Sequence, residues 1–430
     1  MNRSVWRVRW QFMHGNILVL TITQALGQVG RNMAYPYASL FILALGGEPA
    51  QVGLINSLVP LAGLLAFPVA GYLADASGRV RLIAVAGAFS GVIYLLYAAS
   101  PSWEMIAVLA ALQGLVVVQF PPSSALIADS LAPADRVKGA AAMNGISGAL
   151  SLAAPFLAGL LIDRTGVALG MRILYGTLGA IYLLSAGINA RFLRETVHQG
   201  NPVQWASLWE LLHDAYAGIP ALLRSLTPSV RALALVVTLG FVANALAGPF
   251  WVVYAVQQMG LTSGEWGLIL LVEMALLNLS YLPAAAYTDR LGRARVLRWS
   301  LALALVTMPL FVWVQGFWPV LLIRAMMAIS NAFFMPACTA LVADSIPREM
   351  RGRAMAALGR GVVMFGATSG GTGGPGLGFL IIAPMIAASL SGGYLYTLNP
   401  AIPWYASTAA TLLALGVSLR FVRDPQQAHV

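Results

Sequence analysis

Long apolar runs separated by short polar segments dominate the sequence. Runs long enough to cross a hydrocarbon core of about 30 Å lie at residues 15–45, 51–74, 82–100, 104–128, 139–162, 170–191, 232–258, 266–287, 296–315, 319–344, 377–398 and 402–421. Only helices and closed barrels satisfy the backbone in lipid, and the sequence lacks the alternating polarity of barrel strands. We therefore predict an all-α integral membrane protein with twelve transmembrane helices.

Two charged turns divide this apolar pattern into related halves. Residues 71–81 read GYLADASGRVR and residues 286–295 read AYTDRLGRAR, with Asp75 and Asp289 at an offset of 214 residues. A second pair, PPSSALIADS at 121–130 and PACTALVADS at 336–345, repeats at an offset of 215. Two motifs at nearly one offset indicate a duplicated unit. We expect two pseudo-symmetric six-helix bundles, at residues 1–191 and 232–430.

Composition agrees with a place in the bilayer. Hydrophobic residues make up 59% of the 430 positions and charged residues 9%, which leaves too little polar surface for a soluble protein. The net charge is +10, but the basic residues are scattered through short loops, so we do not expect a nucleic-acid partner. Placing both termini in the cytoplasm puts nearly all Arg and Lys on that side, as the positive-inside rule favours. We expect a multi-pass protein of the cell membrane.

Two segments depart from the regular repeat. Residues 192–231 form a linker between the halves, in which the apolar side chains between Trp205 and Tyr216 share one helical face. This pattern predicts an amphipathic helix on the inner membrane surface, while a flexible tether is the alternative for the rest of the linker. The second segment is a glycine-rich insertion at 366–378, which we interpret as a loop or a broken helix. No strand precedes its glycines, so we predict no dinucleotide site and no cofactor.

The pattern Gly-x-Leu-x-Asp-x-x-Gly-Arg-x-Arg at 71–81 resembles the signature loop of the major facilitator superfamily, with a degenerate copy in the second half. The resemblance covers nearly the whole chain. It implies a secondary transporter whose two bundles rock about a midplane cavity, and it implies that charges of these loops join the halves on the inner side when the cavity opens outward. The expected gating residues are Gly71, Asp75, Gly78, Arg79, Arg81, Asp129, Arg136, Asp289, Gly292, Arg293, Arg295, Asp344 and Arg351. Solvated loop charges are the alternative interpretation, above all for Asp129, Asp344, Arg136 and Arg351.

Polar side chains inside the apolar runs are candidate binding residues, because they are costly in lipid and usually face a cavity. In the first run such residues recur at steps of four, three and four, which places them on one helix face. Similar stripes occur in the fourth, seventh and tenth runs, and in the resembling family these helices line the central cavity. The expected substrate contacts are Gln24, Gln28, Arg31, Tyr35, Gln113, Asn244, Trp251, Arg324 and Asn331.

Glu273 is the only acidic residue deep in any apolar run. A buried carboxyl of this kind is a candidate for taking up and releasing a proton during transport. The alternative is a static ion pair with Arg31 or Arg324. Arg stays protonated in practice, so two Arg and one Glu leave a surplus positive charge in the membrane core. That surplus favours a substrate with a carboxylate or phosphate group.

The leading hypothesis is proton-coupled transport, by antiport or symport, of a small organic solute. A proton-driven multidrug exporter is the alternative. The chain has distant similarity to the drug:proton antiporters, because it keeps Gln113-Gly114 and the fifth-run Pro155 and Gly159, but Ala110 stands where those proteins carry Arg. A non-transporting membrane receptor is the alternative of another class.

We do not expect an enzyme. No His lies deep in an apolar run, and the sequence contains no metal-ligand cluster and no nucleophile beside a recognisable base. The expected partners are the substrate, a coupling ion and membrane lipid. We expect a monomer, although Gly87 and Gly91 in the third run would allow close packing against another helix.

Overall fold

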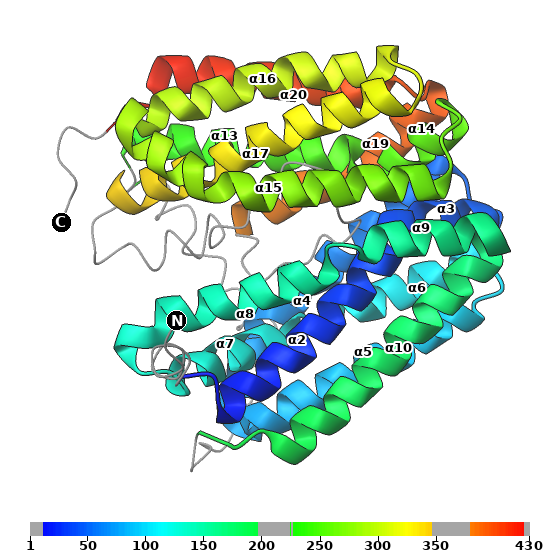
Figure 1. The fold of residues 1–430 in the computed structure, drawn as a ribbon, viewed down its shortest axis with the longest axis vertical. Coiled ribbons are helices and arrows are strands. Elements are labelled where there is room, and N and C mark those ends of the chain that lie inside the picture. The colour runs from blue at the N-terminus through cyan, green and yellow to red at the C-terminus, as the bar shows by residue number, and fades with distance from the viewer. Residues whose placement is uncertain (1–11, 197–223, 225–226, 346–378, 425–430) are drawn as a thin grey trace, which may run out of the picture.

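A computed structural model describes residues 12–196, 224, 227–345 and 379–424. In this part of the chain every regular element is helical (Figure 1). The helix predicted between Trp205 and Tyr216 and the glycine-rich segment 366–378 lie outside the described residues. The all-α prediction is therefore confirmed for the part of the chain that can be examined.

The elements form two bundles (Figure 1). The first contains α2 (Gly15–Ala34), η1 (Tyr35–Tyr37), α3 (Ala38–Ala44), α4 (Pro49–Ser77), α5 (Arg79–Ala99), α6 (Trp103–Gly114), η2 (Leu115–Gln119), α7 (Phe120–Asp129), η3 (Pro133–Asp135), α8 (Arg136–Ser151), α9 (Ala154–Thr165) and α10 (Val167–Phe192). The second contains α13 (Pro228–Ala247), η4 (Gly248–Phe250), α14 (Trp251–Gln257), α15 (Ser263–Leu291), α16 (Arg293–Trp313), α17 (Phe317–Ser345), α19 (Phe379–Leu398) and α20 (Ile402–Phe421).

Proline explains why several predicted runs are divided into shorter helices. Pro36 and Pro249 lie in the 3-10 turns η1 and η4, and Pro155 lies in the first turn of α9. A proline lacks the N–H that would continue the hydrogen-bond ladder, but it fits the first turn of a new helix. The apolar run therefore continues across each break although the helix does not.

Ten helical stretches of the described residues are long and apolar enough to cross a membrane. Residues 15–44 and helix α15 are helical where the sequence predicts spans, but they are not among these ten. The chain is thus a multi-pass membrane protein, and the count of twelve spans stays a prediction for these two segments.

Within the first bundle, α5 and α10 pack closely because glycines face the contact. A Cβ atom on Gly91 would lie 2.8 Å from Cγ of Leu183, and one on Gly179 would lie 2.9 Å from the Gly91 carbonyl oxygen. Small residues let two backbones approach in this way. The close packing that the sequence allows at Gly91 is therefore used inside the chain, against α10.

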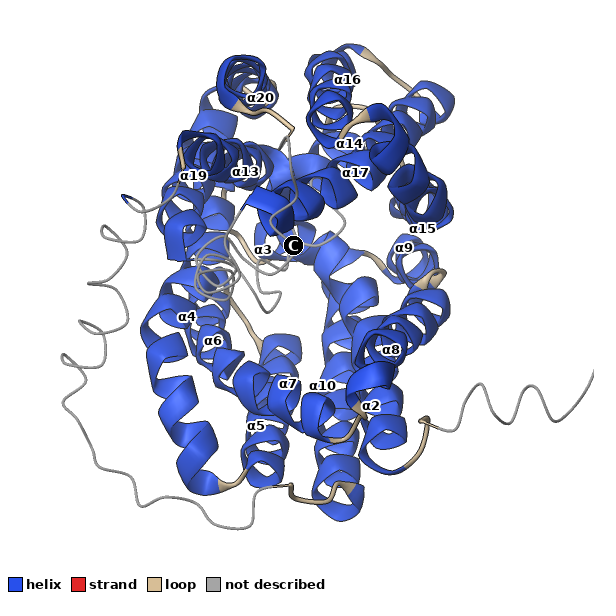
Figure 2. Cartoon of the chain, turned by 90° about the vertical axis from the view of Figure 1, so that its left-hand side faces the viewer, coloured by secondary structure: helices blue, strands red, loops and turns tan. Residues whose placement is uncertain are grey.

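The two bundles contact each other at one end of the molecule. Helix α4 packs against α19, α9 packs against α15, and α3 touches α14. These contacts lie at the right of Figure 1, whereas both described termini lie at the left, where the bundles diverge. Figure 2 views the molecule from that left side, with α13 to α20 above and α2 to α10 below. We name the two ends the closed end and the termini end, and the Arg distribution predicts that the termini end is cytoplasmic.

The α5–α10 contact leads to a stability prediction. Gly91→Ala should lower the unfolding midpoint of the detergent-purified protein relative to Gly187→Ala, a change on α10 where an added Cβ meets nothing within 4 Å. Both variants gain up to about 1 kcal/mol of helix propensity, but only the first overpacks a contact, at a cost of about 1–3 kcal/mol. Equal midpoints for the two variants would contradict the packing described here.

Candidate functional site

A buried ion pair joins α15 and α17 inside the second bundle. Nη2 of Arg324 donates to Oε2 of Glu273, and the two residues are 0% and 2% exposed. The sequence left open whether Glu273 pairs with Arg31 or with Arg324, and the structure selects Arg324. Each charge lacks water but has an opposite charge in contact, so this region of the membrane core is close to neutral.

Two indole rings enclose the Arg324 side chain. Its Cζ atom lies 4.5 Å from the Trp251 ring centroid and 5.3 Å from that of Trp266, within the range of cation–π attraction. Trp251 in turn packs edge-on against Phe311 and Trp404. Trp251 is only 2% exposed, so in this conformation the predicted cavity residue contacts Arg324 and other aromatic rings.

Arg31 on α2 has different surroundings. Its Nη1 donates to the Tyr182 hydroxyl of α10, and its Nη2 donates to Oε1 of Gln28 at 2.8 Å. Among the side chains that the structure describes, no carboxylate lies within ion-pair distance of Arg31. The residue is also only partly buried. The surplus charge expected from the sequence is thus on Arg31, which contacts neutral phenol and amide oxygens.

An amide chain continues from Arg31 across the first bundle. Gln28 donates to Oδ1 of Asn32 at 3.1 Å, and Nδ2 of Asn32 donates to the Ser151 hydroxyl of α8 at 3.1 Å. Gln24, on the same face of α2, donates to Oδ1 of Asn144 at 2.9 Å. The stripe predicted on the first run therefore faces other helices of its own bundle and orients Gln28 toward Arg31.

Phenol rings line the other side of Arg31. The hydroxyls of Tyr35 and Tyr94 share a hydrogen bond, and the Tyr94 and Tyr182 rings meet edge-on with centroids 5.1 Å apart. Sequence reasoning found Tyr35 but missed Tyr94 and Tyr182. A signal was available, because Tyr175 and Tyr182 are seven residues apart, about two helical turns, and so share one face of the sixth run.

The remaining predicted contacts are more scattered. Oε1 of Gln113 is buried and has no hydrogen-bond partner among the described atoms, whereas Asn331 is buried and Asn244 is partly buried. Arg31 and Arg324 each contact side chains of their own bundle, Tyr182 and Gln28 in the first and Glu273 in the second. The structure brings the predicted residues into two separate groups, one in each bundle.

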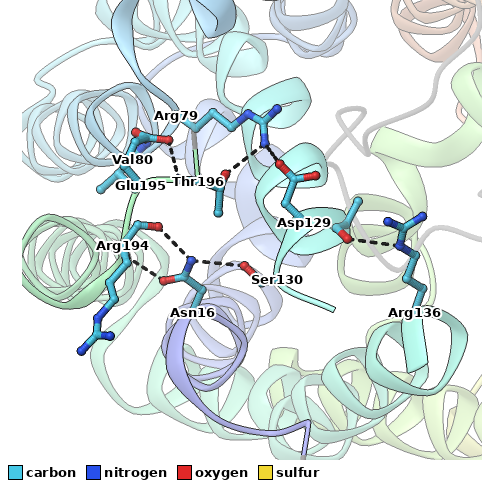
Figure 3. A network of polar contacts seen from close by, with 10 residues as sticks. Asn16, Arg79, Val80, Asp129, Ser130, Arg136, Arg194, Glu195 and Thr196 are labelled. Carbon is cyan, nitrogen blue, oxygen red and sulfur yellow. Dashed lines mark hydrogen bonds and ion pairs between the residues drawn. The ribbon is translucent and has the colours of Figure 1, made fainter. Parts of the chain in front are cut away.

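At the termini end, described gating residues make contacts within the first bundle (Figure 3). Arg79 pairs with Asp129 and donates to the Thr196 hydroxyl at 3.1 Å, and Nε of Arg136 donates to the Ala128 carbonyl oxygen at 3.1 Å. Gly78 and Gly292 have φ angles of 79° and 91°, in the left-handed region that glycine adopts freely.

For several other predicted gating residues the structure describes no side-chain contacts. The side chains of Asp75, Asp289 and Asp344 are not described, and Arg351 lies outside the described residues. Arg293 contacts the Ala340 carbonyl oxygen of its own bundle at 3.5 Å. A gate between the bundles at this end stays a prediction.

Sequence reasoning missed one acidic residue in each half. The Val80 N–H donates to Oε2 of Glu195 at 3.0 Å (Figure 3), and the Ala294 N–H donates to Oδ1 of Asp424 at 2.9 Å. Each acid follows the last helix of its bundle and accepts from the first turn of the helix after the signature glycine, where a carboxylate is favourable. The sequence signal was a third repeat, RFLRE at 191–195 and RFVRD at 420–424.

The charged side chains of the site lie in two groups, one in each bundle. The described residues contain no group of three or more His, Cys, Asp or Glu side chains placed to bind one. The first bundle contributes a guanidinium that donates to neutral phenol and amide oxygens, and the second contributes a carboxylate paired with a guanidinium.

Comparison with known proteins gives one family. A family model described as the Major Facilitator Superfamily matches residues 20–212 and 233–430. The multidrug resistance protein MdtG of Serratia proteamaculans (strain 568) is 25% identical over 355 residues, which cover 79% of this chain and 81% of that protein. MdtG of Salmonella arizonae is 26% identical over 336 residues, covering 75% and 78%. Among solved structures, the nucleoside transporter NupG has a TM-score of 0.69 at 14% identity, covering 94% of this chain and 98% of that one.

The ion pair leads to a prediction about stability. Glu273→Ala should destabilise the protein by about 3–5 kcal/mol, because it leaves Arg324 buried and uncompensated. The double variant Glu273→Ala with Arg324→Met should recover most of this loss, since no buried charge remains. Thermal unfolding of the purified variants in detergent measures both effects. A double variant no more stable than Glu273→Ala alone would show that the buried Arg324 charge is not the cause.

Proposed function

The chain belongs to the major facilitator superfamily of membrane transporters, and on that premise we propose that it moves a small organic solute carrying a carboxylate or phosphate group. Transport proceeds by alternating access of the two bundles and is coupled to protons. The solute's anionic group binds Arg31, and Glu273 is the coupling carboxyl. Both termini face the cytoplasm, and one chain suffices.

The charge balance of the membrane core supports this proposal. Arg324 is neutralised by Glu273, whereas Arg31 contacts only the neutral oxygens of Tyr182 and Gln28 among described partners. An ionised side chain at membrane depth is costly without a partner. An anionic substrate group supplies that partner through charge-assisted hydrogen bonds, and a planar guanidinium suits carboxylate and phosphate well.

The buried ion pair supports proton coupling, because protonation of Glu273 changes the charge balance around Arg324. A proton on Glu273 removes the negative charge and leaves Arg324 alone between Trp251 and Trp266, which is unfavourable in a buried site. Protonation and deprotonation of this carboxyl therefore favour different packing of α15 against α17. A transporter that alternates between two packings gains coupling to the proton in this way.

A multidrug exporter is the second candidate, because the chain is similar to proteins named multidrug resistance protein MdtG. In that case the aromatic group of Trp251, Tyr254, Phe311 and Trp404 contributes a permissive wall for lipophilic cations. Glu273 then attracts the cation, but it first has to leave Arg324. The two candidates thus predict opposite ligand charge and different residues for recognition.

Ligand charge tests the proposal directly. In a thermal-shift screen of the purified chain against matched organic anions and lipophilic cations, anions should stabilise, by about 2.7 kcal/mol at 100 times the dissociation constant. Arg31→Ala should abolish the shift, and Arg31→Lys should keep part of it, because the charge remains but the planar donor fork is lost. Tyr182→Phe serves as a control that preserves the guanidinium and the ring.

The opposite outcome has a defined meaning. If only cations stabilise the protein, and Glu273→Gln removes their effect, the anionic substrate is wrong and the multidrug exporter replaces it.

Proton coupling has its own test in proteoliposomes loaded with a pH-sensitive dye. Substrate-driven proton movement should disappear in Glu273→Gln, because the amide carries no titratable proton, while anion binding through Arg31 persists. Glu104→Gln is the matched control, since Glu104 is an exposed acid in the first turn of α6. Substrate-driven proton movement that persists in Glu273→Gln would show that Glu273 is not the coupling residue.

A further inference from the structure

At the closed end, a pair of glycines brings α4 and α19 into backbone contact. A Cβ atom on Gly53 would lie 2.5 Å from the Ser389 carbonyl oxygen and 2.9 Å from Cα of Gly393. One on Gly393 would lie 2.8 Å from the Pro49 carbonyl oxygen. Since real Cβ atoms essentially never approach closer than 3.0 Å, only glycine fits here while the two helices are together.

A second pair makes the corresponding contact between α9 and α15. A Cβ on Gly159 would lie 2.2 Å from the Ser263 carbonyl oxygen, and one on Gly267 would lie 2.5 Å from the Pro155 carbonyl oxygen. Both contacts join one bundle to the other. At this pair too, a side chain is compatible only with a larger separation of the bundles.

The two contacts are related by the internal repeat. Gly53 and Gly267 are 214 residues apart, the same offset that relates the two signature loops. Gly159 and Gly393 lie on the fifth and eleventh predicted runs, which are equivalent once the insertion in the second half is taken into account. Gly53 and Gly159 of the first bundle thus correspond to Gly267 and Gly393 of the second. The two bundles meet at this end in two equivalent contacts.

The two contacts differ in the hydrogen bonds that join the bundles. Asp163 of α9 accepts two hydrogen bonds from the first residues of α15, from Ser263 N–H at 2.9 Å and from Gly264 N–H at 2.8 Å. The buried Tyr37 hydroxyl lies 2.7 Å from the Pro155 carbonyl oxygen and 3.0 Å from that of Ser263, so it bridges the bundles. A carboxylate of one bundle therefore caps a helix of the other.

The equivalent contact between α4 and α19 has a weaker fastening. There the Ser389 hydroxyl donates to the Gly53 carbonyl oxygen at 3.1 Å, a bond between neutral groups. Charge-assisted hydrogen bonds are roughly twice as strong as neutral ones. The α9–α15 contact is thus the stronger of the two by its polar groups.

We propose that Asp163 and Tyr37 are the residues that hold the gate at the closed end shut, because they fasten α9 to α15 where Gly159 and Gly267 let the two backbones meet. The Asp163 bonds exist only while α9 and α15 are together, so they weight the equilibrium toward the state with this end closed. The inference rests on the alternating access of the proposed function. It does not depend on the charge of the substrate or on Glu273.

The test measures the separation of the bundles at the closed end without any ligand. Spin labels go on Ala168 of α10 and Gln258 after α14, both exposed, in a Cys338→Ser background that removes the single native thiol. In proteoliposomes, Asp163→Ala should raise the ratio of long to short distances roughly tenfold, as expected for losing both hydrogen bonds to an exposed carboxylate. Asp163→Asn should fall between, because its amide oxygen still accepts one bond.

Glycine variants test the contact between the bundles independently of Asp163. Gly53→Ala and Gly267→Ala should both shift the distribution to longer distances, since each added Cβ collides with backbone of the other bundle. Gly416→Ala on α20, where an added Cβ meets nothing within 4 Å, should leave it unchanged. Elution profile and unfolding midpoint establish that each variant is folded, and Asp163→Ala adds no bulk if a glycine variant does not fold.

An unchanged distance distribution in folded Asp163→Ala and Gly267→Ala would overturn the proposed gate. That result is distinguishable from failure of the proposed function, which shows in ligand binding by the unmodified protein. Anion binding without a distance change in the variants would support the proposed substrate and contradict the proposed gate. A distance change in the variants without anion binding would support the gate and contradict the proposed substrate.

Discussion

An ionised side chain in the hydrocarbon core of a membrane is costly without a partner, and this constraint bears on the Glu273–Arg324 pair and on Arg31, which lie in predicted spans. In the second bundle the partner is supplied by the fold: Glu273 and Arg324 are in contact and sealed by Trp251 and Trp266. In the first bundle the fold supplies only the oxygens of Tyr182 and Gln28 to Arg31. The two bundles thus differ in how their charged side chains are partnered.

This division gives each half a different part in the proposed cycle. A partly buried cation with neutral neighbours is suited to a ligand that binds and dissociates, because binding replaces no internal ion pair. A sealed pair is suited to a change of protonation, because one proton alters the packing preference of α15 and α17. Helix α15 also carries the closed-end contact with Asp163 and Gly267. The helix that carries Glu273, the proposed coupling carboxyl, is therefore also the helix that must separate from α9 when the proposed gate opens.

How far the sequence predicts these features depends on how local their causes are. The run expected at 82–100 is helix α5, Arg79–Ala99, because apolar length and a turn glycine are local properties. The partner of Glu273 was left open between two arginines, since only helix packing decides it. Asp163 escaped notice for the same reason, because its partners Ser263 and Gly264 lie far away in the chain. Glu195 and Asp424 are different: their repeat was visible in the sequence and was overlooked.

Counterflow of a labelled organic anion in proteoliposomes tests whether Arg31 receives the charge of a transported solute. Vesicles preloaded with unlabelled anion should accumulate the label, Arg31→Lys should retain part of this exchange, and Arg31→Ala should lose it while remaining folded. Binding without exchange would indicate a receptor rather than a transporter. Exchange of anions that is unaffected by Arg31→Ala, or exchange of lipophilic cations alone, would show that Arg31 does not bind an anionic solute.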